Sequence, residues 1–183
     1  NAHAVLDLKP VILGYTEQRF SADPQARRAF QLLIADLKPG AVFAHWAMDV
    51  NPDHRAAAAL TLEPCMQKGV NLEYFCFEVL SGPGRPQSLG YYPTHYVDIM
   101  RALETKRRMI FCHQSQGPEK IWEAHSEMQQ NRGKECGVEH AEAYIRLTRY
   151  GPLHSELSPF FIESSYHLPR GMGIDVNPAA IGL

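Results

Sequence analysis

The sequence lacks an excess of charge of either sign and any long apolar run. The formal net charge is −2, which leaves no electrostatic footprint for nucleic acid or for an acidic membrane surface. No apolar run approaches the roughly 20 residues that span a bilayer. We therefore expect a protein without a nucleic-acid partner and without a membrane span.

The sequence also lacks closely spaced cysteines. Its four cysteines stand far apart without a Cys-x-x-Cys pair, which argues against a zinc knuckle and favours buried free thiols over disulfides. Free thiols favour a reducing compartment, and we expect a cytoplasmic protein. The chain has neither an initiator methionine nor a signal-peptide pattern. It reads as though it begins inside a helix, so we expect part of the natural protein to be absent from this sequence.

Length and composition predict one globular domain with a sizeable core, since the chain has 183 residues of which 45% are hydrophobic. Beyond Gly151 the pattern dissolves into proline- and serine-containing sequence. We therefore divide the chain into a domain over 1–150 and a C-terminal extension or arm over 151–183. Such an arm can cross the surface or reach a neighbouring subunit, and a homo-oligomer is one expected assembly.

The hydrophobic pattern predicts an α/β fold. Two apolar strands joined by an Ala-rich helix favour a βαβ crossover and a parallel sheet. The segment Ala141–Arg149 suits either a last strand or a docking helix. The segment Ser81–Pro93 is interpreted as a loop or lid, because it lacks the Gly-Lys-Ser/Thr ending of a phosphate-binding loop. The predicted strands are Val11–Tyr15, Ala41–Ala44 and Asn71–Val79, and the predicted helices are 1–6, one beginning at Asp23–Pro24, Arg55–Leu62, Thr94 to about His113, and Glu119–Gln130.

The stretch Ala41–Arg55 concentrates polar and titratable groups at the end of a strand. Asn51 suits a helix N-cap and Pro52 the first helical position, so Asp53 and His54 fall in the first turn. In open α/β sheets, ligands bind at the carboxyl ends of the strands. A histidine here can ligate zinc, and an adjacent carboxylate can orient its ring. The alternative is that Asp53 complements the helix dipole and His54 is a surface residue.

Four segments, in this order, resemble the LmbE-like / PIG-L family of zinc-dependent N-deacetylases. The second segment is the distinctive one, since it resembles the family's "THWxxDxHPDH" signature. The segments are Gly14–Gln18, His45–His54, Cys112–Gln116 after Lys106, and Arg132–Gly137 with His140–Tyr144.

The resemblance implies a Rossmann-like three-layer fold, with a mostly parallel sheet flanked by helices. It implies a metal-dependent hydrolase that removes an N-acetyl group from an amino-sugar conjugate, such as one of N-acetylglucosamine. His54 would be one Zn²⁺ ligand and Asp53 the carboxylate that orients it. Asn51 stands where the family has a histidine that stabilises the tetrahedral oxyanion, and its amide can still donate to an oxyanion.

The resemblance also suggests which residues contact the substrate. Glu17, Arg19 and Asp49 would contact sugar hydroxyls, and His45 would wall the pocket with a hydrogen bond rather than bind metal. For His140 two alternatives stay open, since its side chain could face the same substrate pocket or point away from it. Two further histidines receive other interpretations, with His113 structural at a helix end and His125 facing solvent.

One departure from the family concerns its N-terminal "AHPDD" loop, which this sequence does not contain. The loop carries two zinc ligands and the carboxylate that activates water, whereas catalytic zinc needs three protein ligands. We expect those ligands to come from a missing N-terminal segment. Two alternatives stay open. The chain is a non-catalytic homologue that binds a sugar or protein partner, or it folds only within an oligomer that exchanges its C-terminal arm.

Overall fold

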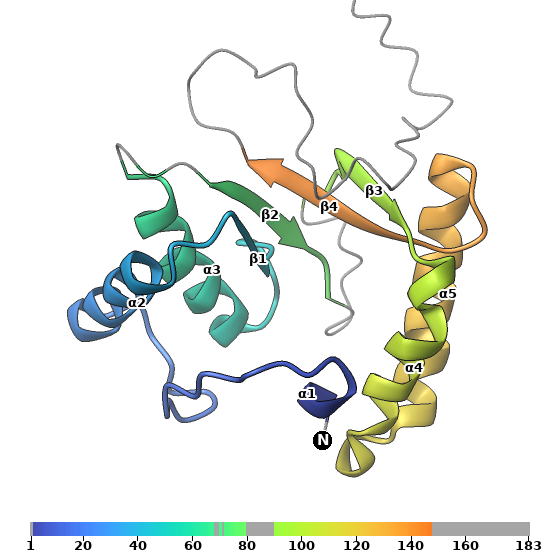
Figure 1. The fold of residues 1–183 in the computed structure, drawn as a ribbon, viewed down its shortest axis with the longest axis horizontal. Helices are drawn as coiled ribbons and strands as arrows, with labels where there is room; N and C mark the ends of the chain where they lie inside the picture. The colour runs from blue at the N-terminus through green and yellow to red at the C-terminus, as the bar shows by residue number, and fades with distance from the viewer. Residues whose placement is uncertain (1, 68–69, 71, 80–89, 148–183) are drawn as a thin grey trace, which may run out of the picture.

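The computed structural model of the chain describes residues 2–67, 70, 72–79 and 90–147. A four-stranded sheet in the order β1-β2-β4-β3 forms the centre of this part of the chain (Figure 1). The strands are β1 (Ala41–His45), β2 (Glu73–Phe77), β3 (His95–Asp98) and β4 (Ala141–Leu147). The α-helices are α1 (Ala2–Val5), α2 (Pro24–Leu37), α3 (Pro52–Cys65), α4 (Leu103–Phe111) and α5 (Pro118–Cys136).

The sheet is mixed. The helix α3 joins β1 to β2, which pair in parallel as the βαβ pattern predicts. The strand β4 pairs antiparallel with both β2 and β3, so β1, β2 and β3 run in one direction and β4 runs against them. The predicted α/β class is confirmed. The expectation of a mostly parallel sheet holds for strand directions, but it is wrong for the hydrogen-bonded pairs, because β4 lies between β2 and β3.

The helices gather at the two ends of the sheet (Figure 1). On one side α2 packs against α3, and α3 contacts β1. On the other side α4 packs against α5, which contacts β3 and β4, while the short α1 lies against α4. None of the described helices is long and apolar enough to cross a membrane.

The main core lies on one face of the sheet, where Ala44, Tyr74, Cys76 and Ile145 pack against helix α3 and the buried Tyr91. The opposite face carries aromatic rings in mutual contact. The ring of Phe43 stacks on Phe75 with centroids 5.1 Å apart and meets Tyr144 edge-on at 5.4 Å. Because β1 lies at the sheet edge, Phe43 keeps 45% of its surface exposed.

The predicted strand Val11–Tyr15 is wrong, because residues 11–15 have no regular secondary structure. A strand needs a neighbour to satisfy its backbone groups, and no described strand pairs with this segment. Its apolar side chains are consequently exposed, with Ile12 at 80%.

The predicted helix from Thr94 to about His113 is wrong in its first part. The residues His95–Asp98 form β3, where the aromatic Tyr96 is buried against Cys136, Ala141 and Ala143. A 3-10 turn, Met100–Ala102, then leads into α4. Pairing with β4 decides this segment, and that pairing is invisible in a local pattern.

Other predicted elements are confirmed or extended. Helix α2 begins after Asp23, whose carboxylate accepts a hydrogen bond from Ala26 N at 2.8 Å, and Ala141–Leu147 is a strand rather than a helix. Helix α5 does not end at Gln130, as predicted, but continues to Cys136, where Gly137 with φ 85° closes it. All four cysteines are free thiols. The predicted loop over 81–89 and the domain boundary at 150–151 lie outside the described residues.

Gly133 explains how α5 approaches β4. A Cβ built there would lie 2.5 Å from the backbone oxygen of Glu139 and 2.6 Å from that of Val138. The helix therefore touches the backbone that leads into β4, and a side chain would push the two apart.

We predict that Gly133→Ala lowers the free energy of unfolding by about 2 kcal/mol, because overpacking exceeds the gain in helix propensity. Urea denaturation measures the change. Gly40→Ala is the matched control, since a Cβ there meets nothing within 4 Å. Its effect should stay within about 0.5 kcal/mol, and equal losses for the two variants would contradict the packing argument.

Candidate functional site

The turn from β1 to α3 is held by two consecutive side-chain hydrogen bonds. Asp49, only 6% exposed, accepts from Asn51 N through Oδ1 at 2.7 Å. The side chain of Asn51 then accepts from Asp53 N at 2.8 Å. Asn51 is thus the N-cap, and Pro52 occupies the first turn, as the sequence predicts. This local bonding fixes the direction in which α3 leaves the strand.

Two histidine rings stack at the end of β1. The rings of His45 and His54 have centroids 4.0 Å apart and an interplanar angle of 18°. The Nδ1 of His54 lies 3.2 Å from Asp49 Oδ1, although this contact lacks the alignment of a hydrogen bond. Asp49 therefore supports the first turn of α3 and one of its histidines together.

His45 is held uncharged at neutral pH. Its pKa is lowered to about 4, chiefly by burial and then by the neighbouring His54, while Asp49 acts in the opposite direction. Its ring also contacts Phe77, with centroids 4.7 Å apart. A neutral imidazole can accept or donate one hydrogen bond or ligate a metal.

Asp53 joins the loop after residue 15 to this cluster. Its Oδ2 accepts from Gln18 N at 2.7 Å, which places Glu17 and Arg19 beside the site, with both exposed. Its Oδ1 is buried and has no hydrogen-bond partner among the described residues. The structure thus brings together the predicted residues Glu17, Arg19, His45, Asp49, Asn51, Asp53 and His54.

His140 lies apart from this cluster. It directly precedes β4, which lies two strands away from β1. His140 is therefore at the same end of the strands as His45. Its side chain is buried, and Nδ1 lies 3.8 Å from Glu139. Across the described ranges no contact joins it to the stacked histidines, so its role in substrate binding stays a prediction.

The chain is similar in sequence to a known deacetylase. The chain is 31% identical over 127 residues to a diacetylchitobiose deacetylase of Thermococcus kodakarensis, covering 64% of this chain and 45% of that protein. This relative supports the resemblance to the LmbE-like / PIG-L deacetylases that the sequence predicts. The chain spans less than half the length of this curated relative. No family model matches the sequence.

Solved structures share the fold of this chain. The N,N'-diacetylchitobiose deacetylase of Pyrococcus horikoshii, complexed with an inhibitor, superposes with a TM-score of 0.64 at 20% identity, covering 84% of this chain and 64% of that one. The 4-carboxy-2-hydroxymuconate hydratase of Pseudomonas putida KT2440 gives 0.67 at 18% identity, covering 86% and 71%. Proteins with different reactions share this fold, so the fold alone does not decide the activity.

The LmbE-like resemblance implies zinc, and the described residues fit it only in part. His54 is available as a ligand, since neutral imidazole suits zinc. In the part of the chain that the structure describes, no three His, Cys, Asp or Glu side chains are grouped to hold a metal ion. A tightly bound catalytic zinc therefore does not fit these residues alone.

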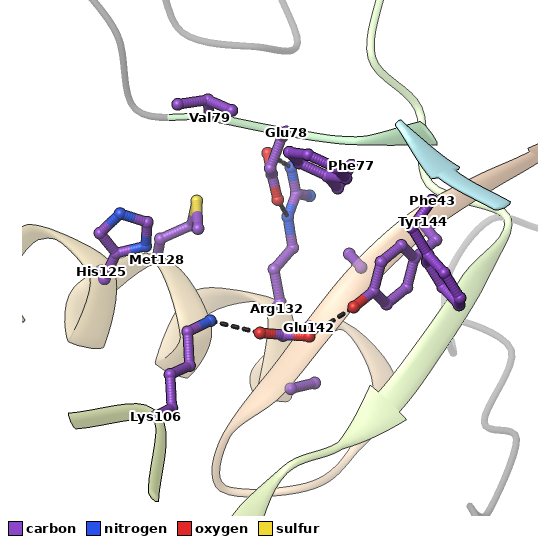
Figure 2. Close-up of a pocket in the computed structure, with 12 residues that line it drawn as sticks. Phe43, Phe77, Glu78, Val79, Lys106, His125, Met128, Arg132, Glu142 and Tyr144 are labelled. Carbon is purple, nitrogen blue, oxygen red and sulfur yellow. Dashed lines mark hydrogen bonds and ion pairs between the residues drawn. The ribbon is translucent and has the colours of Figure 1, made fainter. Parts of the chain in front are cut away.

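A second group of polar residues carries no functional prediction from the sequence. Lys106, His125 and Glu142 line a pocket of about 240 Å³ between the sheet and helices α4 and α5 (Figure 2). The predicted solvent exposure of His125 is wrong, because its Nδ1 is buried. The sequence signal for the burial of His125 is its spacing on α5, where residues 125, 128 and 132 share one helix face.

The lowered pKa of His45 predicts a pH-dependent stability. Between about pH 6.5 and 4, the unfolded ring binds a proton that the folded ring does not, so stability falls as pH drops through this window. We expect His45→Gln to reduce this acid-induced loss by about 1–3 kcal/mol. Urea denaturation at pH 7 and 4.5 measures it. The exposed His113→Gln is the matched control, and equal pH dependence in wild type and His45→Gln would contradict the burial of His45.

Proposed function

We propose that this chain forms part of a hydrolase that removes an N-acetyl group from an amino-sugar conjugate. The observation that supports it most is the cluster of His45, Asp49, Asn51, Asp53 and His54 at the carboxyl end of β1. The two stacked imidazoles and the two carboxylates of this cluster are groups that can accept or donate the protons that move when water attacks an amide. The named activity of the Thermococcus relative points to the same substrate class.

Amide hydrolysis needs a group that handles the proton of the attacking water and a donor for the oxyanion. Asp53 supplies a carboxylate oxygen, Oδ1, that no described residue occupies, and this oxygen can accept a proton or orient the ring of His54. The side-chain oxygen of Asn51 accepts the hydrogen bond that caps α3. The N–H groups of the same amide can then donate to the oxyanion.

The proposed roles of the other residues of the site follow from where each lies around the end of β1. His45 walls the site as a neutral ring, Asp49 fixes the turn, and the loop with Glu17 and Arg19 can contact sugar hydroxyls. Zinc bound at His54 would polarise the acetamide carbonyl, but its other ligands must come from residues beyond those that the structure describes.

A second candidate function is sugar binding without hydrolysis. It is favoured by the fact that the described residues offer no group of three metal ligands. The two functions differ in one readout. A hydrolase releases acetate from N,N'-diacetylchitobiose in the presence of zinc, whereas a binding protein binds the sugar and leaves it intact.

We predict that His54→Ala abolishes acetate release from N,N'-diacetylchitobiose in the presence of added zinc, because it removes the one imidazole at the start of α3. Acetate is quantified enzymatically. His113→Ala, an exposed histidine outside the cluster, is the control and should match the wild-type protein. Normal acetate release by His54→Ala would overturn the assignment of this site.

We predict that Asn51 variants separate the helix cap from the oxyanion donor. Asn51→Asp keeps an oxygen for Asp53 N but loses the N–H groups, so acetate release should fall about 100-fold with stability nearly unchanged. Asn51→Ala should lose activity similarly and also about 1 kcal/mol of stability. Thermal denaturation run beside the activity assay measures both. If Asn51→Asp stays fully active, Asn51 is only a cap.

A further inference from the structure

A turn with a strained backbone lies against the candidate site. It spans residues 16–19 in the segment that leads into α2 (Figure 1), and Arg19 N donates to Thr16 O at 3.1 Å. Among these four described residues only Gln18 has a positive φ, at 61°. Such a backbone is unfavourable for a residue with a Cβ, and glycine is the usual residue there. Strain of this kind persists where the surrounding structure holds it, and it is common at functional sites.

The positive φ of Gln18 decides which way the peptide between Glu17 and Gln18 faces. A turn with a positive φ at its third residue only is of type II, whereas type I has negative φ at both central residues. The two types differ by a rotation of the central peptide through about 180°. In the type II turn seen here, Gln18 N donates to Asp53 Oδ2 at 2.7 Å. A type I turn would direct the carbonyl oxygen of Glu17 towards that carboxylate instead, and two acceptors repel each other.

This hydrogen bond leaves the two carboxylate oxygens of Asp53 with different surroundings. Oδ2 is occupied by Gln18 N, from a residue 35 positions earlier in the chain. Oδ1 is buried and has no hydrogen-bond partner among the residues that the structure describes. The backbone of Asp53 is held separately, because its N–H donates to the Asn51 side chain. One oxygen therefore holds the side chain in place, and the other is left for the reaction.

The turn has an anchor of its own. The rings of Tyr15 and Phe20, on either side of it, have centroids 4.7 Å apart. The ring of Phe20 lies 6.3 Å from that of Phe30 on α2, and α2 packs against α3. The N–H of Gln18 thus has a defined place relative to the first turn of α3, where Asp53 lies.

We propose that Gln18 is a positioning residue whose strained turn aims a backbone N–H at Asp53 and holds that carboxylate in one orientation. Oδ1 is then left to accept a proton or to orient the ring of His54. Because the N–H belongs to the backbone, the conformation at residue 18 carries this role rather than the glutamine side chain. The inference rests on the proposed function for the use of Oδ1, but not for the orientation of Asp53.

Two substitutions separate the backbone conformation from the side chain. Gln18→Gly removes the side chain but suits the positive φ, so it should keep kcat within about twofold and raise the Tm by about 2–4 °C. Gln18→Val places a β-branched residue where it is disfavoured, so the turn should change to type I. The kcat for acetate release from N,N'-diacetylchitobiose with added zinc should then fall about tenfold. KM should change little, because the rotation leaves the Cα atoms of Glu17 and Arg19 in place.

Lys38→Val is the matched control. Lys38 also has a positive φ, of 44°, but it closes α2 before the start of β1, at the end of that strand away from the site. Its replacement should lower the Tm about as much as Gln18→Val and leave kcat unchanged. Gln18→Pro has no N–H to donate and should lower kcat as Gln18→Val does, so the test does not depend on how the turn accommodates valine.

NMR on the full chain measures the orientation without any activity. We expect a scalar coupling across the hydrogen bond, between the Gln18 nitrogen and the Asp53 carboxylate carbon, and a single χ1 rotamer of Asp53. Both should persist in Gln18→Gly, and both should be lost in Gln18→Pro.

Three results would each overturn the positioning role. They are a wild type without the coupling, a single Asp53 rotamer retained by Gln18→Pro, and a loss of kcat in Gln18→Gly or Lys38→Val as large as that in Gln18→Val. A wild type that shows the coupling and the single rotamer but releases no acetate contradicts only the proposed function.

Discussion

The candidate site depends on one buried carboxylate, that of Asp49. A charged group that is almost out of water must be compensated by nearby donors. Asp49 has the backbone N–H of Asn51 and the ring of His54 beside it, and its own carbonyl oxygen accepts from the Arg55 guanidinium at 2.7 Å. These contacts fix the short connection from β1 to α3. The stacking of His45 on His54, and the placement of Asp53 under the Gln18 loop, follow from that connection.

What the sequence could predict was local. The Asn-Pro start of α3, the apolar strand before it and the parallel pairing across α3 can all be read from neighbouring residues. The strand β3 could not, because its hydrogen bonds go to β4, more than 40 residues away. The same limit applies to the site. Asn51, Asp53 and His54 were identifiable, whereas the bond from Gln18 N to Asp53 and the buried face of His125 depend on tertiary packing.

The fold by itself leaves the reaction open, since deacetylases and a hydratase share it. Both kinds of reaction add water to a substrate, and both need groups that move protons at a fixed position. The distinction must therefore come from the atoms around the strand end. The proposed role of the Asn51 amide as an oxyanion donor is one that acyl transfer would use.

The most direct measurement of the central claim is an NMR map of backbone amide shifts on addition of N,N'-diacetylchitobiose to the full chain. The account predicts that the largest changes fall on residues 45–55 at the end of β1 and the start of α3. Changes confined to other parts of the chain, with residues 45–55 unaffected at saturating sugar, would contradict the assignment of this strand end as the site.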